Sequence, residues 1–183
     1  MAISQATPND ASAIAGVHVA TWRATYAGII PHEFLASLST EQRSQFWRER
    51  IENPALSACL FVATTPQEGV VGFVAGGPER TQDPEYTGEV HAIYVLPSRQ
   101  GIGLGRRLFR AAARALADAQ LRSLLVWVLE ANPSRGFYES LGGRQVRRRT
   151  IEIGGAQLAE VGYGWDDTAV LIRMGARKRR PEL

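Results

Sequence analysis

The segment that most constrains the fold runs from Glu89 to Arg114, where three kinds of local signal follow one another without a break. Residues 89–96 are mostly apolar with several β-forming side chains, which predicts a strand. A turn follows with glycine at positions 101, 103 and 105, and a helical stretch starts near Arg106. Glycine brings backbone N–H groups close to a ligand, and a helix N-terminus adds partial positive charge. This order predicts an anion site suited to phosphate.

Spacing narrows the identity of the phosphate ligand. A dinucleotide-binding loop would read Gly-x-Gly-x-x-Gly, but Arg106 stands three residues after Gly103, and no acidic residue lies about 20 positions beyond the glycines. A P-loop would end in Gly-Lys-Ser or Gly-Lys-Thr, whereas two arginines follow Gly105. The sequence therefore disfavours a dinucleotide and a nucleoside triphosphate, and leaves the pattern Gln100-x-x-Gly103-x-Gly105.

Composition predicts one globular domain. The chain has 183 residues, of which 45% are hydrophobic, which is enough for a substantial core. We predict a single domain over residues 1–167 and an extension over 168–183 with a basic, mobile tail. Cys59 is the single cysteine, which excludes an intrachain disulfide and favours a reducing compartment. It lies in an apolar run, which predicts a buried position. No signal peptide or membrane-span pattern is evident, so we expect a cytoplasmic protein without a membrane partner.

Periodicity and breaker residues predict the other elements. Side chains recur at helical spacing between Ala11 and Tyr26, and Ser39–Gln42 has capping-box spacing before a second helix. A short helix is expected after Asn132. Further strands are expected at 58–64, 70–75, 124–130, 144–153 and 156–165. The strands at 89–96 and 124–130 are joined by a helix, so they should be parallel in an α/β sheet of mixed strand direction.

A second motif, Asn132-Pro-Ser-Arg-Gly-Phe-Tyr-Glu-Ser-Leu-Gly142, follows the glycine loop. Together the two motifs resemble the GNAT superfamily of N-acetyltransferases. Trp22–Gly28 resembles the aromatic segment of many bacterial members, and Val161–Trp165 resembles their closing strand. The resemblance covers about residues 2–166.

The resemblance implies an α/β fold with a strongly twisted mixed sheet of about seven strands flanked by helices. It also implies a β-bulge near 91–94, which would splay the parallel pair formed by residues 89–96 and 124–130. Acetyl-coenzyme A would then lie in the V-shaped opening between these two strands. In that family it is the acetyl donor.

The same resemblance implies which residues hold acetyl-coenzyme A. The backbone of Ile93, Tyr94 and Val95 would bind the pantetheine arm, much as an added strand would. The pyrophosphate would be held by the loop and the start of the helix, namely Gln100, Gly101, Gly103, Leu104, Gly105 and Arg106. Asn132 is either a further cofactor contact or a plain helix cap, because it precedes Tyr138 by six positions where seven is usual in the family.

Tyr138 is the general acid that the resemblance implies. Acetyl transfer expels a thiolate, and a phenol with a pKa of about 10 can hydrogen-bond or protonate it as charge develops. The alternative is a core aromatic residue on a short amphipathic helix.

A general base is needed because an amine enters largely as an ammonium and must lose a proton before it attacks a thioester. Glu89 is the first candidate, since a number of family members carry a catalytic glutamate at this place. Strand alternation places His91 on the same face, so His91 is the alternative base. Bound water is a third route, and either side chain would then be structural.

Three aromatic residues are candidates for lining the acceptor pocket or, alternatively, for the core: Trp22, Tyr26 and Trp165. Two arginine runs, 147–149 and 177–180, concentrate charge, but alternation splits the first between two faces and the second lies in the tail. We therefore expect no nucleic-acid partner. The sequence has no spaced His/Cys cluster and no Ser/His/Asp pattern, so we predict neither a metal site nor an acyl-enzyme.

These features lead to the hypothesis of an acyltransferase that moves acetyl from acetyl-coenzyme A directly to a primary amine in a ternary complex. The acceptor would be a small molecule or a peptide. The main alternative is a non-catalytic acyl-coenzyme A sensor, and a nucleic-acid-binding domain is a third hypothesis. The oligomeric state is left open, with a homodimer as one state common in the family.

Overall fold

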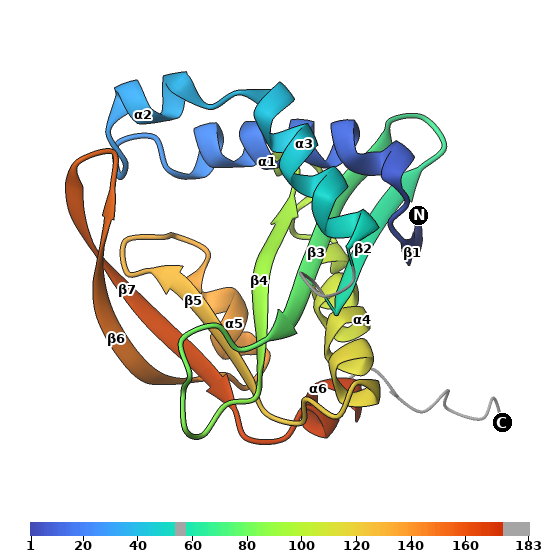
Figure 1. The fold of residues 1–183 in the computed structure, drawn as a ribbon, viewed down its shortest axis with the longest axis vertical. Helices are drawn as coiled ribbons and strands as arrows, with labels where there is room; N and C mark the ends of the chain where they lie inside the picture. Colours follow the sequence, from blue (N-terminus) through green and yellow to red (C-terminus); the bar gives the residue numbers. More distant parts are fainter. Residues whose placement is uncertain (54–57, 174–183) are drawn as a thin grey trace, which may run out of the picture.

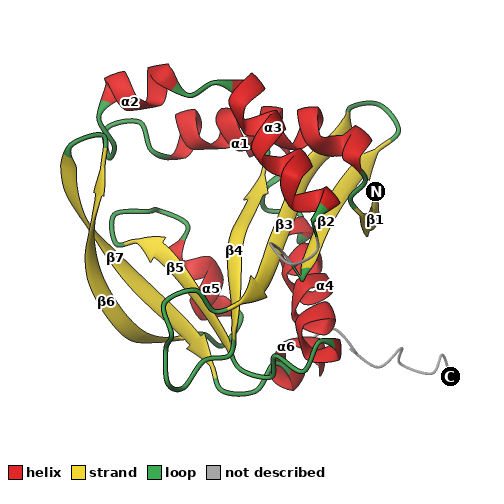
Figure 2. Cartoon of the chain, in the orientation of Figure 1, coloured by secondary structure: helices red, strands yellow, loops and turns green. Residues whose placement is uncertain are grey.

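The computed structural model describes residues 1–53 and 58–173, which form one mixed sheet with helices on both faces (Figure 1, Figure 2). The sheet has seven strands in the order β1-β2-β3-β4-β5-β7-β6. Their bounds are β1 (Ala2–Gln5), β2 (Cys59–Thr65), β3 (Gly69–Pro78), β4 (Gly88–Val95), β5 (Leu124–Leu129), β6 (Arg144–Ile153) and β7 (Ala156–Trp165). The predicted α/β architecture is confirmed.

Four of the helices lie close to where the sequence predicts them, whereas those at 32–37 and 169–173 were not predicted. The helices are α1 (Ala11–Thr25), α2 (His32–Ser37), α3 (Thr40–Glu52), α4 (Leu104–Asp118), α5 (Arg135–Ser140) and α6 (Ala169–Arg173), with 3-10 turns at η1 (Pro8–Asp10) and η3 (Pro97–Arg99). The Ser39 hydroxyl accepts a hydrogen bond of 3.2 Å from the Gln42 amide and so caps α3. Helix α4 begins two residues before the predicted start at Arg106, directly after the glycine turn.

Side chains alternate between two cores along the central strands. Helix α4 packs on one face through Leu108 and Phe109, in a cluster that also includes Val74 of β3. Helices α1 and α3 pack on the other face, where Ile14 and Trp47 meet Phe73. Because both faces are covered, the central strands are apolar on both sides, as expected for a buried sheet.

The parallel pair β4–β5 stays together over only two residue pairs. Gly88 pairs with Leu124 and Glu89 with Leu125, and beyond them the strands diverge (Figure 1). On the other edge of β4, Ala75 of β3 is opposite Ala92 and Gly76 is opposite Val90. His91 is therefore the extra residue of a β-bulge. The predicted splay is confirmed, and the bulge falls at the first residue of the predicted range.

The β6–β7 hairpin reaches toward α2 and closes the far side of the splay (Figure 1). Its tip carries Ile153 and Leu158, which join Tyr26 and Leu35 in a third hydrophobic cluster. A side chain at Gly154 would lie 2.7 Å from Cβ of Phe34, so the turn must come close to α2. The N-terminal helices and the β6–β7 hairpin are therefore in contact across the open end of the splayed strand pair β4–β5.

Folded structure continues beyond residue 167. Leu171 of α6 is fully buried in the core on the α4 side, and the Ile172 carbonyl accepts a 3.4 Å hydrogen bond from Arg110. The predicted tail with the arginine run at 177–180 lies outside the described residues. Cys59 is buried, and burial raises the pKa of its thiol to about 12, which fits a core residue. Within residues 1–53 and 58–173, no helix has the length and apolar character needed to cross a bilayer.

Candidate active site

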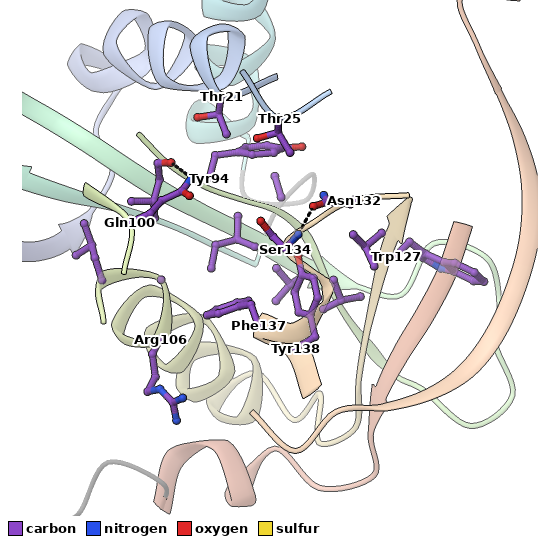
Figure 3. A pocket seen from close by; sticks show the side chains of 18 of the residues that line it. Thr21, Thr25, Tyr94, Gln100, Arg106, Trp127, Asn132, Ser134, Phe137 and Tyr138 are labelled. Atoms are coloured by element: carbon purple, nitrogen blue, oxygen red, sulfur yellow. Dashed lines mark hydrogen bonds between the residues drawn. The ribbon is translucent and has the colours of Figure 1, made fainter. Parts of the chain in front are cut away.

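A cleft of about 440 Å³ opens where β4 and β5 diverge (Figure 3). Its walls come from α1, β4, the glycine turn with the start of α4, β5, and the segment leading into α5. Most of the predicted site residues line it: Tyr26, His91, Ile93, Tyr94, Val95, Gln100, Gly101, Gly103, Leu104, Gly105, Arg106, Asn132 and Tyr138. The fold thus brings together two motifs that lie about 30 residues apart in the chain.

The glycine turn leaves backbone donors at the N-terminus of α4. Gly101 and Gly103 have φ angles of 75° and 81°, a left-handed backbone conformation that residues other than glycine rarely adopt. Gly103 is the N-cap of α4 and provides no capping side chain. The first bond of the helix runs from the Arg107 amide to the Gly103 carbonyl, so the N–H groups of residues 104–106 have no helical acceptor. This end of α4 fits a pyrophosphate.

Gly105 and Arg106 line the cleft and also make structural contacts. A side chain at Gly105 would lie 3.3 Å from the Phe137 ring, so glycine here lets α5 pack closely against α4. The Arg106 side chain points away from the pocket in Figure 3 and approaches Ser140 at 3.4 Å. Gln100 donates a 2.9 Å bond to the Val95 carbonyl, which ties the turn to the end of β4.

Beyond Glu89, no strand of the described structure pairs with the edge of β4 that faces β5, although the Val95 carbonyl accepts from Gln100. Ile93, Tyr94 and Val95 pair with β3 on their other edge. Backbone groups along the open edge can therefore pair with an extended ligand, as in strand addition. The Tyr94 ring stacks on His18 at 5.0 Å, and burial raises the pKa of Tyr94. Trp47 donates a bond to His18, whose pKa burial lowers to about 3, so the stacked imidazole stays neutral.

Tyr138 lies on α5 and is 8% exposed, with its ring stacked on Tyr163 at 5.7 Å. Burial raises the pKa of Tyr138, because a phenolate would lose its hydration. The hydroxyl therefore remains protonated at neutral pH and is suited to donating a hydrogen bond into the cleft.

Asn132 has two structural hydrogen bonds. Its side-chain carbonyl accepts from the Ser134 amide at 2.7 Å, and its amide group donates to the Tyr26 hydroxyl at 3.1 Å. The first bond closes an Asx turn just before α5, whose N-cap is Ser134, and the second connects this turn to the end of α1. Asn132 also lines the cleft, so this structural role and a ligand contact are compatible.

Glu89 is held by an arginine. Its side chain is 1% exposed and forms an ion pair with Arg80, whose backbone amide and Nε also donate to Oε2, at 3.3 and 3.1 Å. Glu89 is not among the described residues that line the cleft.

His91 lines the cleft, and its orientation does not follow from strand alternation. Alternation predicts that His91 shares a face with Glu89, but the bulge falls on His91 itself and interrupts the alternation there. The imidazole Nε2 lies 3.2 Å from the Pro78 carbonyl. Burial and the nearby Arg80 lower the pKa of His91.

Two of the three aromatic candidates are not among the lining residues. Trp165 lies on the α4 side of the sheet, where its ring packs 5.2 Å from Phe109 and its indole donates to the Leu141 carbonyl. Alternation along β7 places it there, because Val161 and Tyr163 belong to the same core. Trp22 packs edge-on against Tyr26 and supports the cleft wall from behind. Tyr26 alone lines the cleft.

Several lining residues were not identified from the sequence: Thr21, Thr25, Trp127, Ser134 and Phe137. Trp127 lies within an apolar strand whose pattern indicates only core. In Figure 3 its ring points toward the β6–β7 hairpin. The Arg149 guanidinium covers the ring at 3.9 Å. Arg149 is held in turn by Glu160. Thr21 and Thr25 are four residues apart, and this helical spacing, which places them on one face, could have identified them from the sequence.

The first arginine run is paired with carboxylates. Arg147 contacts Asp83 and Glu85, Arg148 contacts Glu130, and Arg149 contacts Glu160. Such pairing leaves less free positive charge on this strand than the sequence alone indicates. The part of the chain that the structure describes contains no group of three or more His, Cys, Asp or Glu side chains arranged to hold a metal ion.

Comparison with known sequences identifies the family. The sequence model of the acetyltransferase (GNAT) family matches residues 22–143, which include both motifs and most of the cleft. The chain belongs to the GNAT family of acetyltransferases. A protein of Bacillus subtilis described as an uncharacterized N-acetyltransferase is 39% identical over 169 residues, which cover 92% of this chain and 95% of that protein. A probable N-acetyltransferase of Mycobacterium tuberculosis is 26% identical over 88% of this chain and 91% of its own.

Solved structures show the same fold as this GNAT chain. A ribosomal-protein-alanine N-acetyltransferase from Brucella melitensis superposes with a TM-score of 0.70 at 20% identity, covering 90% of this chain and 99% of that chain. The yncA protein of Salmonella typhimurium, solved with acetyl-CoA, gives a TM-score of 0.68 at 22% identity, covering 90% and 92%. These structures support the GNAT fold, and membership of the family supports acyl transfer as the general chemistry.

Proposed function

We propose that the protein transfers acetyl from acetyl-coenzyme A directly to a primary amine of a small molecule or peptide, within a ternary complex. The observation that carries the proposal is the convergence of three features on one cleft. These are the free N–H groups at the start of α4, the unpaired edge of β4, and the Tyr138 hydroxyl. The first two suit the pyrophosphate and the pantetheine arm, and the third suits the departing sulfur.

Residues 93–95 and 100–106 would hold the donor, whose thioester supplies an activated acetyl group. A base removes a proton from the acceptor ammonium, and the amine nitrogen then forms a C–N bond with the acetyl carbon as the C–S bond breaks. Tyr138 gives its proton to the sulfur and regains one from the attacking nitrogen. The ammonium thus loses two protons, of which one ends on the thiol and one in solvent, and no acyl-enzyme forms.

Calorimetric titration with acetyl-coenzyme A tests the donor half of this proposal. We expect saturable binding and a rise in the melting temperature, because a ligand that binds only the folded state stabilises it. Coenzyme A without the acetyl group should bind as well, since the proposed contacts are to pyrophosphate and pantetheine. Absence of both binding and stabilisation would refute the proposal.

A panel of amines, monitored by release of free thiol, tests the transfer. We expect at least one primary amine to increase thiol release above the rate of hydrolysis, with the acetylated product confirmed by mass spectrometry. Tight donor binding with slow hydrolysis and no transfer to any amine would instead indicate a non-catalytic acyl-coenzyme A sensor.

A further inference from the structure

Glu89 and His91 are two residues apart in β4, and the bulge gives them different surroundings. Glu89 is buried, and both of its carboxylate oxygens contact Arg80. His91 is the extra residue of the bulge and lines the cleft. A general base must reach the proton that it removes, so access favours the histidine.

We propose that His91, which lines the cleft and is oriented by the Pro78 carbonyl, is the general base of the acetyl transfer, and that Arg80, anchored by Glu89, acts on it as a positioning residue. This inference rests on the proposed function. It assigns Glu89 to the support of Arg80 instead of to proton transfer.

The tautomer of His91 follows from its partner. The Pro78 carbonyl can only accept, so Nε2 at 3.2 Å must carry the hydrogen. Nδ1 then has the lone pair, and no described residue donates a hydrogen bond to it. Nδ1 is the atom available to take a proton from an ammonium, with one N–H bond broken and one formed.

The charges around His91 favour its neutral form. Arg80 on the loop after β3 and Arg50 on α3 both oppose a positive charge on the ring, and burial opposes it more strongly. Glu89 and the Pro78 carbonyl act in the opposite direction, with smaller effect than burial and Arg80 combined. The pKa of His91 is therefore lowered, so the ring can accept a proton at neutral pH.

Arg80 needs an anchor because it lies on a loop and its side chain is 53% exposed. Glu89 supplies it: the carboxylate accepts from the backbone amide, from Nε and from Nη2 of Arg80. A bidentate pair of this kind fixes the guanidinium plane as well as the charge. The buried glutamate thereby holds a cation beside the base.

An NMR titration of the His91 imidazole tests the effect of Arg80 without any acceptor. In the wild type we expect the His91 resonance to titrate below the ordinary histidine pKa of 6.5. Arg80→Gln removes the cation and leaves the Glu89 charge, so the titration should shift upward by about one pH unit. The double variant Arg80→Gln/Glu89→Gln avoids an unpaired buried carboxylate and should shift upward by less. Arg144→Gln, which breaks a remote pair with Asp166, is the matched control and should shift nothing.

Thiol release with the acceptor found in the amine panel tests the base itself. We expect His91→Gln to lower turnover at pH 7.5 by about a hundredfold or more. In the double variant, the pH below which turnover falls should rise together with the His91 titration. Wild-type turnover in His91→Gln, or an unchanged His91 titration in both Arg80 variants, would overturn the inference.

Failure of the proposed function is distinguishable from failure of this inference. A wild-type protein that binds acetyl-coenzyme A but transfers to no amine would refute the function and the base role together, while the NMR titration would still decide whether Arg80 controls the histidine. An active wild type with an active His91→Gln variant would refute the inference alone.

Discussion

The half of the cleft suited to acetyl-coenzyme A is built largely from one continuous stretch of chain, whereas the opposite half is assembled from distant segments. Residues 93–106 supply the open edge of β4 and the donors at the start of α4. The other half combines Thr21 and Tyr26 of α1 with His91 and Trp127. In the first half the recognising groups are mainly backbone, and in the second they are side chains.

This difference determines which residues of the cleft can change independently during evolution. Backbone donors depend on conformation, so they constrain a few glycines and little else. Side chains on separate segments can change one at a time without altering the loop that holds the donor. A common donor with many acceptors is therefore a natural use of this architecture.

Among the variants that test this division, Tyr138→Phe should give the largest effect. It removes the proposed proton donor for the leaving sulfur, and we expect turnover to fall by about a hundredfold while the Kd for acetyl-coenzyme A changes little. Tyr163→Phe is the matched control, because this tyrosine stacks on Tyr138 but its hydroxyl donates to Glu139. Steady-state kinetics with calorimetry would measure both. Equal losses in the two variants would point to packing as the role of Tyr138.

A smaller effect is expected from the conformation of the glycine turn. Gly103→Ala places a side chain at a φ of 81°, which costs about 1–2 kcal/mol and should reorient the donors at α4. We expect about a tenfold loss of affinity for acetyl-coenzyme A, measured by calorimetry. Gly155→Ala, in the β6–β7 turn, has a φ of 82° and equally open surroundings. It should lose similar stability but no affinity, and a loss of affinity there would break the assignment.

The sequence was informative where the interactions are local. The strand, the glycine turn and α4 follow one another in the chain, so periodicity and turn chemistry predicted them within a few residues. The strands were predicted from apolar pattern and breaker residues, whereas the twist and splay of the sheet came from the family resemblance. The assignment of Tyr138 to the same site also came from the resemblance of the motif at 132–142.

What remained hidden depends on pairing between segments. The Arg80–Glu89 ion pair joins a loop to a strand across nine residues, and no local pattern indicates that the glutamate is already occupied. The family resemblance implied a bulge near 91–94, but its position on His91 follows from the pairing of β4 with β3, which alternation within β4 cannot reveal. Trp127 and Trp165 both lie in apolar strands, and only the assembled sheet shows which face each one occupies.

Tyr26 offers the mildest and most discriminating test of the division into halves. Tyr26→Phe removes the hydroxyl that accepts the 3.1 Å bond from Asn132, a loss of about 0.5–1.5 kcal/mol. We expect the KM of the acceptor to rise about threefold to tenfold while the Kd for acetyl-coenzyme A stays within twofold. Tyr86→Phe, which removes a buried hydroxyl bonded to Asp166 away from the cleft, controls for stability. If the Kd rises and the KM does not, the link between Tyr26 and Asn132 serves the donor, and α1 belongs to both halves of the cleft.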